Sequence, residues 1–410
     1  MTSGGETLTC PFDFSEGLEF DPSLAALMHR DSITRIRLPY GDGDAWLVTG
    51  FEDVRQVTTD QRFSRAAIVE CDYPRLTPEP IVSPESINVM DPPRSSRLRR
   101  LASQAFTQRQ ADRMRGRITR LADTLLDEMA AKGQPADLVH HLSNPLPQQT
   151  IFDLFGIPQD DWAPTQQHLH HLLATGPDSR KTAAAAKAEL RAYFGELVQQ
   201  RRKSPGNDLI SALVAAKDGE DTLDDEELTV MALTLTLSGQ DTATCQISNI
   251  LYLLLTRPKL MHHVVSRPED LTDILNELLR VIPFRKGVGI PRVALEDVEM
   301  GGVLIRKGDF VHVSYLTANR DPERYPNPDS IDPDRPPQPH MTFGWGGHRC
   351  IAVPLAMAEL EVAIRQLLDR FPRLQLALPP EAVRWDTKTI RRFPIELPVT
   401  WQDPPTNRPH

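Results

Sequence analysis

The chain of 410 residues is 40% apolar and 25% charged, a composition typical of globular proteins and unlike that of disordered chains. Its formal net charge of −10 argues against nucleic-acid binding, which requires a basic surface. The four cysteines form neither a CxxC pair nor a zinc-like spacing, and the first residues lack the pattern of a secretory signal. Since no apolar stretch reaches the ~18 residues of a membrane span, we expect a cytoplasmic protein with no membrane association.

The first half of the chain predicts a small β region followed by helices. Apolar alternation on both sides of a Gly-Asp cluster predicts a hairpin with strands at 33–38 and 45–49. Residues 72–93 contain six prolines and little periodicity, which indicates a long irregular loop, and loops of this kind are usually functional or mobile. Apolar side chains at 3.6-residue spacing then predict helices over 97–106, 111–132, 183–202 and 209–216.

A long buried helix is predicted from about residue 224 to about residue 255, because an acidic start suits the positive end of a helix dipole and apolar residues follow nearly all round. Ser238-Gly-Gln-Asp-Thr242 interrupts this apolar pattern. The Thr242 hydroxyl can donate to the Ser238 carbonyl and bend the helix locally, and small side chains at Ser238, Gly239 and Ala243 would open a notch. The alternative is a capped break between two shorter helices, which the apolar pattern on both sides disfavours.

A second amphipathic helix is predicted over 271–282, and it contains the acid–base pair Glu277 and Arg280 at i,i+3 spacing. Taken alone, such a pair is more typical of an exposed helix face. The pattern then changes to β-like segments at 292–298 and 308–315, followed by a proline-rich meander over 322–339 and a last long helix over about 352–371.

The segment Phe343-Gly-Trp-Gly-Gly-His-Arg-Cys350 places a cysteine at the start of that last helix. Three glycines within four residues let the backbone turn tightly and approach a neighbour closely. The helix dipole and the basic neighbours His348 and Arg349 favour a thiolate. A lone cysteine is more often a small buried apolar residue, but this setting is that of a metal-ligating thiolate.

These motifs occur in the order in which they are found in a known family, together with Asp332-Pro-Asp-Arg335 in the meander. The chain resembles the soluble bacterial cytochromes P450, which are heme-thiolate monooxygenases, from Asp91-Pro-Pro to Leu397-Pro-Val-Thr-Trp401. The resemblance implies a mainly α fold with small β-sheets and a long central helix. It implies one heme domain over 1–410, with an N-terminal segment (1–30), part of the small β region (31–70) and a helical body (97–280 and 350–371).

The resemblance implies a binding site for heme b (Fe-protoporphyrin IX). It assigns Cys350 as the axial ligand of the heme iron. It assigns Arg99, Arg292 and His348 as partners of the heme propionates, since buried carboxylates need charge-assisted bonds. The chain departs from the family at Ser95, where a histidine is common, so one propionate contact is missing or replaced by water.

The resemblance also implies roles for two further groups of residues. Asp241 and Thr242 match the acid–alcohol pair that orders water and relays protons to dioxygen. Glu277, Arg280 and Arg335 match a structural triad that fixes the meander behind the heme.

Six residues are assigned to the substrate pocket by their position in the family: Asn88, Leu237, Ser238, Val288, Ile390 and Arg391. The irregular loop at 87–89 would form the roof of this mostly apolar pocket. The stretch from Glu277 through Asn319-Arg-Asp-Pro322 looks most like actinobacterial enzymes of secondary metabolism and antibiotic biosynthesis, such as biflaviolin synthase and couplers of cyclic dipeptides.

The resulting hypothesis is the oxidation of an aromatic natural product, by C–C or C–N coupling of a tryptophan-containing cyclic dipeptide or a phenolic polyketide. One alternative is hydroxylation of a macrolide, polyketide or other secondary metabolite. An alternative from another class is a non-enzymatic heme sensor or carrier, which would have no use for Asp241 and Thr242. Electrons are expected from NAD(P)H through a ferredoxin reductase and a ferredoxin, with Arg349 as a candidate docking residue.

Overall fold

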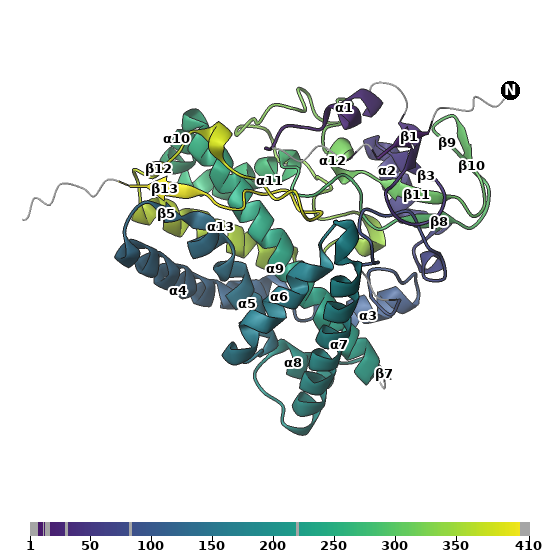
Figure 1. Cartoon of the computed structure of the whole chain (residues 1–410), viewed down its shortest axis with the longest axis horizontal. Helices are drawn as coiled ribbons and strands as arrows, with labels where there is room; N and C mark the ends of the chain where they lie inside the picture. The colour runs from purple at the N-terminus through teal and green to yellow at the C-terminus, as the bar shows by residue number, and fades with distance from the viewer. Residues whose placement is uncertain are drawn as a thin grey trace, which may run out of the picture.

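The computed structural model describes residues 7–401, except 11, 13–16, 29–31, 82–83 and 219–220. Figure 1 shows helices gathered around a long central helix. The labelled strands of the largest sheet lie to one side of this helical body, on the right of the view. No helix in this described part of the chain is long and apolar enough to cross a membrane. The predicted mainly α fold with small sheets is confirmed.

The α-helices of the described residues are α1 (Pro22–Met28), α2 (Phe51–Thr59), α3 (Arg94–Ser103), α4 (Gln108–Lys132), α5 (Pro145–Phe155), α6 (Trp162–Leu172), α7 (Arg180–Lys203), α8 (Leu209–Ala215), α9 (Asp225–Thr256), α10 (Pro258–Ser266), α11 (Leu271–Val281), α12 (Tyr315–Ala318) and α13 (Val353–Arg370). Periodicity predicted α3, α4, α7, α8, α9, α11 and α13 to within about a turn at each end. It missed the remaining helices, which are short or, like α5, carry prolines in the first turn, where a helix tolerates them.

Helix α9 forms the centre of the helical body. Asp224 and Glu227 form a capping box at its start, in which each side chain accepts the backbone N–H of the other residue. The helix continues without interruption through residues 238–242, so the prediction of one long helix is confirmed. The Thr242 hydroxyl donates to the Ser238 carbonyl at 2.8 Å, as predicted. Helices α5, α7 and α13 pack against α9.

The strands are β1 (Leu8–Thr9), β2 (Ile33–Arg37), β3 (Ala45–Val48), β4 (Phe63–Ser64), β5 (Ala136–Asp137), β6 (Lys217–Asp218), β7 (Asp221–Thr222), β8 (Arg292–Ala294), β9 (Val298–Met300), β10 (Val303–Ile305), β11 (Phe310–Val313), β12 (Gln375–Leu376) and β13 (Pro398–Thr400). The largest sheet has the order β1-β2-β3-β11-β8-β4. In it, β2 and β3 form the predicted antiparallel hairpin, and β11 joins β3 in parallel. Strands β8 and β4 pair antiparallel, so chain segments near residues 64 and 293 lie side by side.

Two long irregular segments connect these elements. The described residues of 72–93 contain no helix or strand, only a single bridge from Arg75 to Tyr40. Residues 322–339 likewise contain no helix or strand. Both segments were predicted to be irregular from their prolines, which remove backbone donors and fix φ.

Candidate active site

The glycine turn before Cys350 is fixed to helix α2. Gly346 has a φ of +66°, and a Cβ atom on it would lie 2.4 Å from the Thr58 carbonyl oxygen, so only glycine fits there. Trp345 packs edge-on against Phe51 of the same helix, with ring centroids 5.8 Å apart. Helix α2 thus sets the position of the cysteine that follows.

The Cys350 side chain is exposed, although the chain surrounds it closely enough on its other sides that burial raises the pKa of its thiol. The Ala352 N–H, Arg99 and Arg349 lower this pKa by less than burial raises it. The helix start and Arg349 thus act in the direction expected from the sequence, and burial of the side chain opposes them. A coordinated metal ion would deprotonate the thiol outright.

Cys350 is not part of a protein-only cluster of metal ligands among the described residues. Within this part of the chain, no group of three or more His, Cys, Asp or Glu side chains could hold a metal ion.

Four basic side chains form an incomplete cluster beside Cys350. They are Arg65, Arg99, Arg292 and His348, and each of the three arginines contributes to lowering the pKa of His348, which burial lowers most, to about 2. Arg292 is 2% exposed, and both of its terminal nitrogens are buried without a hydrogen-bond partner among the described residues. His348 Nδ1 is equally buried and unpartnered within the same described part of the chain. Since unsatisfied buried donors and adjacent like charges are costly, this cluster requires an anion.

The centre of α9 is built from small and polar residues with different tasks. A Cβ atom on Gly239 would lie 2.7 Å from Cδ1 of Ile151, so this glycine allows α5 to pack closely on α9. Ala243 is also buried, whereas Ser238 is exposed. The predicted notch is therefore wrong for Gly239, whose small size serves helix packing.

Asp241 is held by arginines that do not belong to α9. Its side chain is 4% exposed, and Oδ2 accepts a hydrogen bond from Arg285 Nη2 at 2.5 Å. Oδ1 lies 3.6 Å from Arg391 Nη1, which is within ion-pair range but too long for a hydrogen bond. Arg391 also contacts His170 at 2.8 Å and Asp386 at 3.3 Å. The carboxylate thus belongs to a charged network that reaches the exposed His170.

A cavity of about 170 Å³ lies between the centre of α9 and the irregular segment 72–93. It brings together five of the six predicted substrate contacts, namely Asn88, Leu237, Ser238, Val288 and Ile390. The sixth, Arg391, does not line the cavity, because its guanidinium is engaged with Asp241 and its neighbours.

Sequence reasoning missed several polar residues of this cavity, among them Arg285 and His312. The His312 ring is 1% exposed, and its nitrogens lie 3.1 and 3.0 Å from the carbonyl oxygens of Gly289 and Pro74. Burial lowers its pKa to about 4, so the ring is neutral at pH 7 and donates to one of the two carbonyls. No motif marks either residue, since each depends on segments that only the fold brings together.

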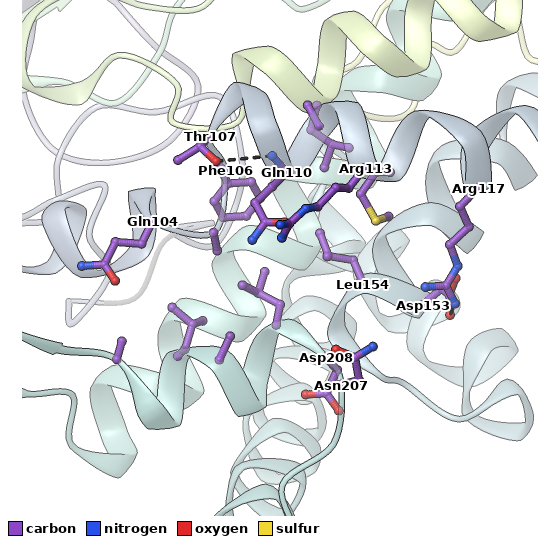
Figure 2. Close-up of a pocket in the computed structure, with 18 of the residues that line it drawn as sticks. Gln104, Phe106, Thr107, Gln110, Arg113, Arg117, Asp153, Leu154, Asn207 and Asp208 are labelled. Atoms are coloured by element: carbon purple, nitrogen blue, oxygen red, sulfur yellow. Dashed lines mark hydrogen bonds and ion pairs between the residues drawn. The ribbon is translucent and has the colours of Figure 1, made fainter.

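A larger cavity, of about 560 Å³, lies on another part of the molecule (Figure 2). It lies among the ends of α3, α4, α5 and α8, and none of the predicted site residues lines it. Arg117 and Asp153 pair at its edge, and the Thr107 hydroxyl accepts the Gln110 N–H at 3.3 Å. These polar groups already pair with one another and leave no free group for a substrate or a cofactor among those named here. The larger cavity is therefore not the candidate active site, and cavity volume alone does not identify it.

Glu277 connects helix α11 to the meander. Its carboxylate accepts two hydrogen bonds from Arg280, both at 2.8 Å, and a third from Arg335 Nε at 3.0 Å. Arg280 also donates to the carbonyls of Asn319 and Pro328 at 2.8 Å. These buried, multiply bonded charges fix the chain leading toward Cys350.

Comparison with known proteins identifies the family. The model of the cytochrome P450 family matches residues 162–266 and 270–384. The chain belongs to the cytochrome P450 family. It is 44% identical to nocardicin C N-oxygenase of Nocardia uniformis subsp. tsuyamanensis, covering 97% of this chain and 99% of the relative. It is 41% identical to biflaviolin synthase CYP158A1 of Streptomyces coelicolor, covering 94% of each.

A solved structure of the same family is closely similar. It is that of cytochrome P450mel 107F1, with biaryl coupling reactivity, which has a TM-score of 0.95 and 56% identity and covers 97% of this chain and 100% of that one. The predicted family, fold and enzyme class are confirmed by these matches. The non-enzymatic alternative finds no support among the relatives described above, which are enzymes.

Heme is the prosthetic group that a P450 implies, and this chain's residues fit it. The exposed Cys350 side chain offers the single thiolate that heme iron takes from the protein. The unpartnered nitrogens of Arg292 and His348 offer donors for carboxylates such as the heme propionates. Burying these cationic groups without an anion would be costly, so the cluster fits the binding of such carboxylates.

Proposed function

We propose that this P450 oxidises an aromatic natural product of secondary metabolism, by coupling two aromatic rings through a C–C or C–N bond or by hydroxylating one. The observation that carries the proposal is the cavity beside α9, in which leucine side chains meet a few polar groups. The biaryl coupling reactivity of the similar solved structure supports coupling. A phenolic polyketide or a tryptophan-containing cyclic dipeptide would supply the O–H or N–H that such coupling needs.

Proton delivery is assigned to Asp241 and Thr242. The Thr242 hydroxyl donates its proton to the Ser238 carbonyl, which leaves its lone pairs free to accept a hydrogen bond from a bound water. Asp241 is tied to Arg285, whose side chain lines the cavity and is 32% exposed. Asp241 therefore reaches the cavity through Arg285, and bound water would have to join its carboxylate to the Thr242 hydroxyl for general acid–base chemistry.

The protein's remaining tasks are positioning and electron supply. Bound heme supplies the activation of dioxygen, while Cys350 ligates the iron and the triad of Glu277, Arg280 and Arg335 fixes the meander. A ferredoxin, reduced from NAD(P)H by its reductase, is the proposed electron donor in the cytoplasm. Arg349 is exposed next to Cys350, so it can contact an acidic ferredoxin surface close to the heme.

One observation favours hydroxylation of a single molecule over coupling of two. The cavity volume of about 170 Å³ lies below the ~300–1,000 Å³ of typical drug-sized ligand sites. It accommodates one small planar aromatic better than two aromatics or a macrolide. Coupling of two aromatic substrates therefore requires the cavity to widen when they bind.

A type I spectral-shift screen tests the proposal. Ferric protein is titrated with hydroxynaphthoquinones, tryptophan-containing cyclic dipeptides and macrolides, and hits are turned over with ferredoxin, reductase and NADPH. We expect aromatic ligands to shift the Soret band and macrolides to fail. Mass spectrometry then separates a +16 product from a dimer, and selective binding of macrolides would contradict the aromatic proposal.

A further inference from the structure

The pairing of β4 with β8 brings two arginines close together. In the antiparallel pair of β4 and β8, Phe63 faces Ala294 and Ser64 faces Val293. Arg292 is the first residue of β8, and Arg65 directly follows β4, where the backbone turns into a helical conformation. Both side chains are buried, and like charges close together in a buried site repel each other, so this pair needs a compensating group.

Among the described residues, no carboxylate forms an ion pair with either guanidinium. Arg65 is 7% exposed, and its Nε is buried without a hydrogen-bond partner in the same part of the chain. The Asp91 carboxylate accepts hydrogen bonds from the Ser64 hydroxyl and from the Arg65 backbone N–H at 3.0 Å, and it acts on the guanidinium only through its charge. Burial, followed by the charge of Arg292, lowers the pKa of Arg65 to about 9, which still leaves it protonated at pH 7.

We propose that Arg65 binds a heme propionate together with Arg292 and His348, and that it takes the place of the cationic partner that a serine at position 95 cannot provide. The proposal rests on the heme binding proposed above. The buried anion that would relieve the repulsion between Arg65 and Arg292 is then a carboxylate of the cofactor. Ser95 itself is 3% exposed and too short to add a cationic donor.

The same guanidinium also reaches the substrate cavity. Arg65 Nη1 donates to the carbonyl oxygen of Asn88 at 2.9 Å, and Asn88 lines the cavity from the irregular segment 72–93. Arg65 is thus a positioning residue that joins the heme carboxylate to the roof of the pocket. Occupancy of the heme site orders the roof through this one side chain.

The test is the rate at which ferric holoprotein loses heme to excess apomyoglobin. We expect Arg65→Gln, which can still donate to the Asn88 carbonyl, to lose heme roughly ten-fold faster, because a charged hydrogen bond to a carboxylate is removed. Arg65→Lys retains the charge and should lie close to the native rate. Arg65→Gln should also lower the heme reduction potential, since a cation near the heme stabilises the reduced state.

Two controls separate the possible explanations. Arg94→Gln removes an arginine from the start of α3 whose side chain is 57% exposed, and it should leave both readouts unchanged. Exchange of heme for its dimethyl ester, which lacks propionate charge, should abolish the difference between native protein and Arg65→Gln. A difference that persists with the ester, or native rates of heme loss in Arg65→Gln, would overturn the inference while leaving the proposed function intact. Failure of the native chain to bind heme would instead overturn the proposed function.

Discussion

Two adjacent glycines in the turn before Cys350 differ in the space available for a side chain. Gly346 combines a φ of +66° with a backbone contact to α2, whereas nothing lies within 4 Å of a Cβ atom placed on Gly347. We expect Gly346→Ala to lower the free energy of unfolding by about 1–3 kcal/mol and to weaken heme retention. Gly347→Ala is the matched control and should change neither. Equal stability of the two variants in denaturant titrations would contradict the assigned packing.

At Thr242 the hydroxyl is the group that matters. Thr242→Ala removes the hydroxyl that donates to the Ser238 carbonyl and that we assign to proton delivery. The backbone hydrogen bonds of α9 are not changed by this substitution. We expect NADPH to be consumed with product yield lowered roughly ten-fold and hydrogen peroxide raised, because a lost general acid–base group costs ~10²-fold or less when water partly substitutes for it. Thr242→Ser should retain coupling. If Thr242→Ala yields as much product per NADPH as the native protein, protons reach the site by another route.

At the scale of elements, Glu277 joins α11 to the meander and makes stability depend on pH. Burial alone would raise the pKa of Glu277, but hydrogen bonds from Arg280 and from the Asp332 N–H outweigh it and lower the pKa below 4.5. The unfolded chain therefore takes up a proton first as the pH falls. The contribution of the carboxylate is complete above about pH 4.5 and is lost as the pH falls through the folded-state pKa.

We therefore expect Glu277→Gln to destabilise the protein by about 3–5 kcal/mol at pH 7, because two buried arginines lose their partner. The difference from native protein should shrink as the pH is lowered below 4.5, as measured by denaturant unfolding at each pH. Glu269→Gln, at an exposed position just before α11, should show no such pH-dependent difference. A constant difference across this pH range would show that the charge of Glu277 is not what stabilises the meander.

The sequence predicted the elements whose own residues determine them. Helix α9 and the hairpin of β2 and β3 carry periodic patterns, and the irregular segments carry prolines. Strand β4 has only two residues and depends on pairing with β8, which no local pattern reveals. Helix α2 carries buried Phe51, Val54 and Val57 at helical spacing, but nine residues give a weaker signal than the long helices do. That the sequence did not predict these two elements matters for the site. Helix α2 positions the turn before Cys350, and Arg65 directly follows β4.

At the scale of the whole molecule, the site combines residues that are distant in the chain. Motifs pointed to Cys350, Asp241 and Thr242 because each lies in an unusual local sequence. Cys350 follows a glycine-rich segment, and Asp241 and Thr242 lie in a polar interruption of a buried helix, which costs stability unless it has a function. Arg285 and Arg65 have no such pattern, since their roles arise only where the sheet and the segment after α11 meet α9 and the loop before α13. The sequence therefore pointed to the chemistry of the site, and the structure shows which charges surround it.

The central claim is that the chain binds heme through the Cys350 sulfur. The most direct measurement is the absorption spectrum of reduced protein under carbon monoxide, for native protein and for Cys350→Ser. The native protein should show the red-shifted Soret band of a thiolate ligand, and Cys350→Ser should lose that band together with oxygen-dependent turnover. A native spectrum of the histidine type, or an unchanged spectrum in Cys350→Ser, would contradict the claim.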